Sequence, residues 1–142
     1  MTDTDRPPAF IFDIDGTVAI RNGRDPYDWD LASTDLPNQA VIDVAQALDH
    51  AGHRLLYVSG RPEDIRTTTE LWLHEHVGVE APLLMRPRGD FRSDIEIKRE
   101  IYLNEIKPNY QVTAVFDDRT RIVELWRNEF GLVCLQVAPG EF

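Results

Sequence analysis

The chain has 142 residues, of which 42% are apolar and 28% are charged, and its formal net charge is −10. This length predicts a single domain that can bury its own core. The negative charge argues against broad, sequence-independent clamping of duplex nucleic acid, which needs many phosphate contacts from Lys and Arg, but it is compatible with a local basic pocket for one terminal phosphate. The acidic start, and the lack of any apolar stretch long enough to span a membrane, indicate a cytoplasmic protein with no membrane partner.

Apolar runs alternate with helical patterns along the whole chain. The runs predict strands over 9–12, 55–58, 83–85, 112–116 and 132–137. The helical spacing predicts helices over 37–51, 62–77, 93–106 and 120–130. Ser93 and Glu96 have the spacing of a capping box at the start of the third helix. The single cysteine, Cys134, falls in the last apolar run and is interpreted as a buried core thiol.

Strands that alternate with helices predict an α/β fold in which a parallel, five-stranded sheet is covered on both faces. We expect residues 1–8 to be a flexible N-terminus and residues 9–142 to form the domain. Residues 19–36 show no helical or strand pattern, and a loop of that length in a compact domain is usually functional. No segment between the predicted strands is large enough to form a separate cap domain.

Two pairs of aspartates directly follow two of the predicted strands. Asp13 and Asp15 belong to the run Asp-Ile-Asp-Gly-Thr at 13–17, and Asp117 and Asp118 follow the fourth strand. Ligands of such sheets bind beyond the carboxyl ends of the strands, so these four carboxylates are expected to converge. They would repel one another without a cation, and oxygen-only ligation suits Mg²⁺. The alternative is a set of turn formers and helix caps in solvated loops, which the joint pattern disfavours.

A possible anion site follows the second strand. Ser59, Gly60 and Arg61 stand where we expect a helix to begin, and exposed N–H groups at a helix start favour an anion. The alternative for Ser59 alone is a plain helix cap in front of Pro62. Lys98 lies in the predicted helix 93–106, and taken by itself it could be an ordinary surface lysine.

The run Asp-x-Asp-Gly-Thr, then Ser-Gly-Arg, then a lysine, then Asp-Asp, in this order on alternating strands and helices, resembles the haloacid dehalogenase superfamily of phosphohydrolases. The resemblance implies a Rossmann-like three-layer sandwich with strand order 5-4-1-2-3. Longer stretches are similar to the 3′-phosphatase domain of bacteriophage-type polynucleotide kinase/phosphatase, with shorter segments after Arg61 and at 86–88. The stretches that carry this similarity are 22–28, 58–61, 89–94, 117–120, 123–127 and 136–142.

The resemblance assigns the chemistry. It implies that Asp13 attacks phosphorus and forms an aspartyl-phosphate, and that Asp15 is the general acid and base. It implies that Mg²⁺ is held by Asp13, by the backbone carbonyl of Asp15 and by the pair Asp117 and Asp118, with Asp118 favoured as the direct ligand. The chain has no Gly-x-x-x-x-Gly-Lys-Ser/Thr loop for ATP, so any kinase is expected to be a separate polypeptide.

The resemblance also implies a phosphate-binding set and two supporting residues. Asp94 is expected to orient Lys98 or Arg61, and Arg119 supports the site beside the second acidic pair. Two aromatic residues, Tyr27 and Trp29, could stack on a base, although such residues more often attach a loop to the core. The residues expected to bind the substrate phosphate are Thr17, Arg24, Ser59, Gly60, Arg61 and Lys98.

The leading functional hypothesis is a polynucleotide 3′-phosphatase that acts on 3′-phosphorylated DNA or RNA ends in repair, with a separate kinase or ligase as a possible partner. The alternative enzyme is a phosphatase of small nucleotides or sugar phosphates. A signalling receiver domain is disfavoured because its phosphorylated Asp follows the third strand, where this chain has Met85-Arg86-Pro87. A non-catalytic binding module would not need the four acids.

Overall fold

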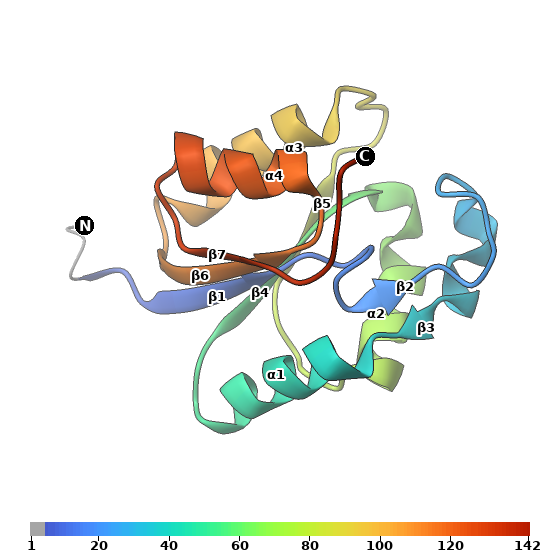
Figure 1. Ribbon diagram of the computed structural model, residues 1–142, viewed down its shortest axis with the longest axis horizontal. Coiled ribbons are helices and arrows are strands. Elements are labelled where there is room, and N and C mark those ends of the chain that lie inside the picture. Colours follow the sequence, from blue (N-terminus) through green and yellow to red (C-terminus); the bar gives the residue numbers. More distant parts are fainter. Residues whose placement is uncertain (1–4) are drawn as a thin grey trace.

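The computed structural model describes residues 5–142, and its centre is a sheet of five parallel strands (Figure 1). The order across the sheet is β7-β6-β1-β4-β5. Counted along the chain, this is the expected order 5-4-1-2-3. Apolar runs became strands here because a parallel sheet is buried on both faces. The strands are β1 (Pro8–Phe12), β4 (Leu55–Pro62), β5 (Leu83–Arg86), β6 (Gln111–Asp117) and β7 (Cys134–Gln136).

Helices cover both faces of the sheet, which confirms the predicted three-layer α/β sandwich (Figure 1). On one face lie α1 (Gln39–His50) and α2 (Arg66–His76), and on the other lie α3 (Asp94–Ile101) and α4 (Thr120–Glu124). The helices α3 and α4 continue into the π-helical turns η4 (Tyr102–Ile106) and η5 (Leu125–Glu129). The side chain of Ser93 caps α3 by accepting the N–H of Glu96 at 3.4 Å, as the capping-box spacing predicted.

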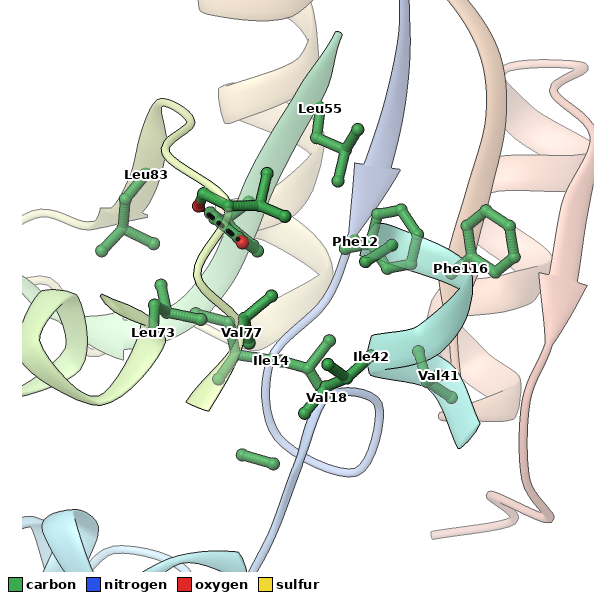
Figure 2. Close-up of a cluster of buried hydrophobic side chains, with 14 of the residues drawn as sticks. Phe12, Ile14, Val18, Val41, Ile42, Leu55, Leu73, Val77, Leu83 and Phe116 are labelled. Atoms are coloured by element: carbon green, nitrogen blue, oxygen red, sulfur yellow. Dashed lines mark hydrogen bonds between the residues drawn. The ribbon is translucent and has the colours of Figure 1, made fainter. Parts of the chain in front are cut away.

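Each face of the sheet has its own hydrophobic core. Phe12 packs toward α1 and α2, and its ring stacks on that of Phe116 at a centroid distance of 4.4 Å (Figure 2). Ile11 points to the opposite face, where it joins Trp126 and the buried Cys134. Burial raises the pKa of the Cys134 thiol to about 12, which fits a core residue. Asp13 therefore follows the carboxyl end of a strand whose last two residues are buried, one on each face of the sheet.

One boundary differs from the prediction and bears on function. Strand β4 continues through Ser59, Gly60 and Arg61 to Pro62, and α2 begins only at Arg66, after the 3₁₀ turn η3 (Glu63–Ile65). The expected helix start at Ser59 is therefore wrong. Pro62 takes an extended conformation, with φ −71° and ψ 148°, so the chain stays strand-like beyond the predicted end. No helix N-terminus lies at Ser59 to attract an anion.

The segment expected to be patternless is partly ordered. Residues 19–37 contain the short antiparallel pair β2 (Ala19–Ile20) and β3 (Leu36–Pro37), and between them the 3₁₀ helix η2 (Trp29–Thr34). These elements are too short for periodicity to reveal. Within residues 5–142 no separate cap domain is present, and no helix in that range has the length and hydropathy to cross a membrane. The expected flexible segment 1–8 falls partly outside the described residues and stays a prediction.

The core on the α1 side can be tested with two residues of the same helix. Ile42 is fully buried in the core on this side of the sheet (Figure 2), whereas Val44 is 41% exposed. Ile42→Ala should lower the free energy of unfolding by about 2–5 kcal/mol, because it removes buried methyl groups and leaves a cavity. Val44→Ala should change it by no more than about 0.5 kcal/mol. Urea titrations of both variants measure the difference, and equal losses would contradict this packing.

Candidate active site

A tight turn after β1 forms the floor of the site. The carbonyl oxygen of Ile14 accepts the N–H groups of Thr17 and of the two residues that follow it, at 2.9–3.1 Å. Gly16 has a φ of +82°, and a Cβ there would lie 2.1 Å from Oδ2 of Asp118. A glycine is required for two reasons, because this φ suits no other residue well and because Asp118 fills the space. The turn therefore leaves room for the carboxylate of Asp118, which follows β6.

Three of the predicted acids meet at this turn. Asp13, Asp117 and Asp118 each offer a carboxylate oxygen, and these oxygens lie within 4.8 Å of one another. All three residues are at most 6% exposed. Strands β1 and β6 are neighbours, and the N–H of Asp13 donates to the carbonyl of Phe116 at 3.0 Å. The expected convergence of the acidic pairs is therefore present for these three carboxylates.

Lys98 reaches this cluster from α3. Its Nζ donates to Oδ1 of Asp13 at 2.7 Å and to Oδ2 of Asp117 at 3.1 Å. The residue is only 4% exposed, so the alternative of a surface lysine is wrong. Burial lowers the pKa of Lys98, but Asp117 and Asp13 outweigh the burial and raise it above its ordinary value. Lys98 therefore carries a full positive charge inside the site.

The two members of the second acidic pair differ in what surrounds them. Asp117 accepts hydrogen bonds on both oxygens, from Lys98, from the indole N–H of Trp126 at 3.2 Å and from the backbone N–H groups of Asp118 and Arg119 at 2.8 and 3.3 Å. Asp118 has one side-chain donor in the described part of the chain, the hydroxyl of Thr17, at 3.4 Å. Asp118 is therefore the freer of the two to bind an ion.

The charges of this cluster do not balance. Three carboxylates surround the single ammonium group of Lys98. Burial, together with Asp117 and Asp118, raises the pKa of Asp13 well above its usual range, although Lys98 opposes the shift. A cation that binds oxygen ligands would relieve this repulsion. The donor set of closely spaced carboxylates fits Mg²⁺ or a similar divalent ion.

A second cluster holds the other predicted acid. Arg61 donates two hydrogen bonds to the carboxylate of Asp15, from Nε at 3.0 Å and from Nη2 at 2.7 Å. It also donates a hydrogen bond to Asp35 at 2.9 Å. Arg24 binds Asp35 with two further hydrogen bonds, at 2.7 and 2.8 Å. The indole of Trp29 lies against both guanidinium groups. Its ring centroid is 5.2 Å from Cζ of Arg24 and 5.7 Å from Cζ of Arg61. Trp29 therefore attaches the 19–37 segment to the site, which was the favoured reading of this aromatic residue.

The arrangement of Arg24 differs from the expected phosphate contact. A guanidinium group has five N–H donors, and here those of Arg24 go to Asp35, to Asp15 at 3.4 Å and to the carbonyls of Asp25 and Pro26 at 3.1 Å. No donor is left for a phosphate in this arrangement. Arg24 instead holds the acids in place.

Asp35 was missed by the sequence analysis. It lies in the patternless segment, and no motif marks it. Its side chain is fully buried and accepts hydrogen bonds from both Arg24 and Arg61. The indole N–H of Trp72 also donates to its backbone carbonyl, at 2.9 Å. Asp35 is thus the residue that links the two arginines.

A third cluster lies at the rim and corrects a prediction. Asp94 was expected to orient Lys98 or Arg61, but its carboxylate pairs with Arg86 and, at 3.1 Å, with Arg119. Asp94 is the first residue of α3, so its side chain reaches the ends of β5 and β6, whereas Lys98 lies one turn further along the helix. Arg119 does support the second acidic pair, through its backbone N–H.

The remaining predicted residues lie between these clusters. Ser59 is fully buried, and its Oγ accepts the N–H of Arg61 at 3.0 Å. The carbonyl of Gly60 accepts a hydrogen bond from Arg86 at 2.8 Å. The hydroxyl of Thr17 lies 3.2 Å from Asp13 and 3.4 Å from Asp118, so its one proton can serve either acid. Ser59 and Gly60 thus lie on β4, which pairs with β1, and Thr17 lies in the turn that follows β1.

The buried pairing of Asp35 can be tested with a control from the same segment. Asp35→Asn removes the charge shared by two buried arginines and should lower the free energy of unfolding by about 3–5 kcal/mol. Asp30→Asn changes an exposed aspartate of η2 and should cost no more than about 0.5 kcal/mol. Chemical denaturation measures both variants. Equal stability of the two would show that Asp35 does not hold the arginines.

Comparison with known proteins places this site in a family. The family model of the polynucleotide kinase PNKP phosphatase domain matches residues 7–142. The "Putative bifunctional polynucleotide kinase/RNA ligase" of Autographa californica nuclear polyhedrosis virus is 31% identical over 127 residues, which are 86% of this chain and 18% of that protein.

Solved structures agree with this match. A chain of the Pnkp1/Rnl/Hen1 complex superposes with a TM-score of 0.93 and 40% identity, over 100% of this chain and 49% of that one. The class C acid phosphatase of Bacillus anthracis shares the fold, with a TM-score of 0.66 and 19% identity over 97% of this chain and 68% of that one. This chain spans less than half the length of its polynucleotide kinase relatives. On these matches, the chain belongs to the family of polynucleotide kinase PNKP phosphatase domains.

Proposed function

We propose that this chain is a Mg²⁺-dependent polynucleotide 3′-phosphatase, which releases terminal phosphate through an aspartyl-phosphate on Asp13. The observation that carries the proposal is the position of Asp13. Its carboxylate is buried at the carboxyl end of β1, bonded to Lys98 at 2.7 Å and close to Asp118. Family membership supports the reaction type, and the relatives that include polynucleotide kinase chains support a nucleic-acid end as the substrate.

The proposed reaction has two displacements at phosphorus. In the first, an oxygen of Asp13 bonds to phosphorus while the bond to the 3′ oxygen breaks, and Asp15 gives that oxygen a proton. In the second, water attacks the aspartyl-phosphate, Asp15 takes the proton of the water, and Asp13 is freed with the release of inorganic phosphate. Asp15 suits this task because Arg61 fixes its carboxylate while its side chain stays 36% exposed, open to substrate and water.

The metal ligands in this proposal are Asp13, Asp118 and the backbone carbonyl of Asp15. Asp117 orients Lys98 and the 118–119 backbone, since its own oxygens are already engaged. A bound Mg²⁺ would offset the charge between the nucleophile and the phosphate, which otherwise repel each other. Lys98 opposes the rise in the pKa of Asp13 and orients its carboxylate.

The substrate phosphate needs donors as well. Lys98 has three N–H groups, and two of them are engaged by Asp13 and Asp117, which leaves one for a phosphate oxygen. The hydroxyl of Ser59 has no acceptor among residues 5–142, so it can donate a second hydrogen bond. The hydroxyl of Thr17 is shared between two acids and can turn to the phosphate. Gly60 and Arg61 would position these phosphate donors through the backbone of β4.

The names of the relatives support one kind of polynucleotide as the substrate. One of the similar structures is described as the Pnkp1/Rnl/Hen1 RNA repair complex, and the viral relative is named for RNA ligase activity. These names support RNA ends as substrates, with a kinase or ligase that acts on the same ends. A DNA end and a small nucleotide or sugar phosphate are the alternatives to test. The cytoplasmic location stays a prediction.

The proposed activity predicts a clear order of substrates. With Mg²⁺ present, a 3′-phosphorylated oligonucleotide should release phosphate faster than a 3′-mononucleotide or a sugar phosphate. Asp13→Asn should lower kcat by at least about a thousandfold because the nucleophile is lost. Asp30→Asn is the matched control and should keep full activity. A preference for sugar phosphate would defeat the nucleic-acid assignment, and activity retained by Asp13→Asn would defeat the covalent mechanism.

The metal site can be tested without any turnover. At about 100 times its Kd, Mg²⁺ should stabilise the folded chain by about 2.7 kcal/mol and raise Tm by roughly 5–10 °C. Asp118→Asn should abolish this rise while its own Tm without metal equals or exceeds that of the unmodified chain, because one repelling charge is gone. Glu75→Gln removes an exposed charge of α2 and should leave the rise intact. A full Mg²⁺ response in Asp118→Asn would exclude Asp118 as a ligand.

A further inference from the structure

The exposed aromatic residues of this chain are unevenly distributed. Of the Phe, Tyr and Trp residues in the range 5–142, only Tyr27, Phe91 and Phe142 are exposed, by 83%, 95% and 62%. The exposed aliphatic side chains are spread more widely and also occur on α1, α2 and β7. Exposed apolar side chains mark a binding surface when they gather on one part of the protein.

All three rings lie in segments that follow the carboxyl ends of strands. Tyr27 is in the segment after β1, Phe91 is in the loop between β5 and α3, and Phe142 is in the segment after β7. In Figure 1 the loop between β5 and α3 and the C-terminal segment approach each other above that edge of the sheet. This is the edge that carries Asp13 and Asp118.

Hydrogen bonds from Arg86 and Arg119 connect the backbones next to Phe91 and at Phe142 with the same carboxylate, that of Asp94. Arg86 donates to the carbonyls on both sides of Phe91, those of Asp90 and Arg92, and also to Asp94. Arg119 donates to the other oxygen of Asp94 at 3.1 Å and to the carbonyl of Phe142 at 2.9 Å. The two segments are thus tied together through Asp94.

The segment that ends in Phe142 is pressed against the loop that carries Asp118. A Cβ at Gly140 would lie 1.9 Å from the carbonyl oxygen of Asp118, so only glycine fits this close approach. The carbonyl of Gly140 also accepts the N–H of Thr120 at 2.9 Å. The guanidinium of Arg119 stands over the ring of Phe142, 5.4 Å from its centroid. Phe142 is therefore held beside the loop that carries Asp118.

The charges of this rim favour uncharged contacts with a substrate. Arg86 is paired with Asp94, Arg92 is paired with Asp90 and Glu100, and the chain carries a net charge of −10. Such a surface offers little attraction to a polynucleotide backbone. Stacking of bases on aromatic rings needs no charge and tolerates any sequence.

We propose that Phe91 and Phe142 form the stacking surface for the terminal base of a polynucleotide whose 3′-phosphate occupies the Asp13 site. This inference rests on the proposed 3′-phosphatase function and adds to it how a nucleic-acid end is told from a small phosphate ester. A 3′-phosphate bound at Asp13 would place the base next to it at the edge of the sheet where the two rings lie. Tyr27 makes an edge contact with Trp29 at 6.3 Å and belongs to the neighbouring segment.

The test compares two oligonucleotides that differ by one base. Both carry a 3′-phosphate on the sugar that the enzyme accepts, and one has an abasic tetrahydrofuran analogue as its last nucleoside. For the unmodified chain, kcat/KM should be roughly 5- to 150-fold higher with the base present, the range expected for one stacked base. The double variant Phe91→Ala/Phe142→Ala should bring this ratio close to one, mainly through KM.

Controls separate stacking from a structural effect. Leu71→Ala removes a side chain that is 64% exposed on α2 and should keep the ratio of the unmodified chain. Phe91→Trp and Phe142→Trp should restore the ratio, since another aromatic ring can stack, whereas leucine at these positions should not. The abasic oligonucleotide should be hydrolysed equally by the unmodified chain and the double variant.

Each other outcome is decisive. Equal hydrolysis of the two oligonucleotides by the unmodified chain overturns the stacking surface and leaves the 3′-phosphatase function standing. An equal loss on both substrates in the double variant shows a structural role and also overturns it. If the unmodified chain releases phosphate from neither oligonucleotide but does so from a sugar phosphate, the proposed function itself has failed, and the stacking surface fails with it.

Discussion

The buried ammonium group of Lys98 is the interaction on which the rest of the site depends. It joins three elements, because α3 supplies the lysine while β1 and β6 supply Asp13 and Asp117, at 2.7 and 3.1 Å. A buried lysine is tolerated only when it is paired, so loss of either partner would leave an uncompensated charge inside the protein. The same bonds turn Asp13 toward the edge of the sheet and occupy Asp117, which leaves Asp118 as the open carboxylate.

The arginines around the acidic cluster form ion pairs with acids of the protein itself. Arg24 and Arg61 are paired with Asp15 and Asp35, and the rim arginines Arg86 and Arg119 share Asp94. These pairs hold the acids in fixed directions and contribute little positive potential. Under the proposed function, a site of this kind would depend on a divalent cation and on Lys98 to attract a phosphate, and on base contacts to recognise a polynucleotide. The overall negative charge of the chain is consistent with that division of roles.

The sequence was sufficient for the sheet and for the main acids. Apolar runs marked the five strands because both faces of a parallel sheet are buried, and the acids follow these runs directly. Pairings between distant loops could not be predicted, since they depend on tertiary placement. Asp35 has no pattern around it, and Asp94 binds Arg86 and Arg119 where Lys98 or Arg61 was expected.

The central claim is that the phosphoryl group passes through Asp13. The most direct measurement is acid quenching of a single turnover with an oligonucleotide whose 3′-phosphate is radiolabelled, followed by peptide mapping. The account predicts a hydroxylamine-sensitive label on the peptide that contains Asp13, formed only when Mg²⁺ is present and absent in Asp13→Asn. A label on a different residue, or phosphate release with no labelled protein at any time, would contradict it.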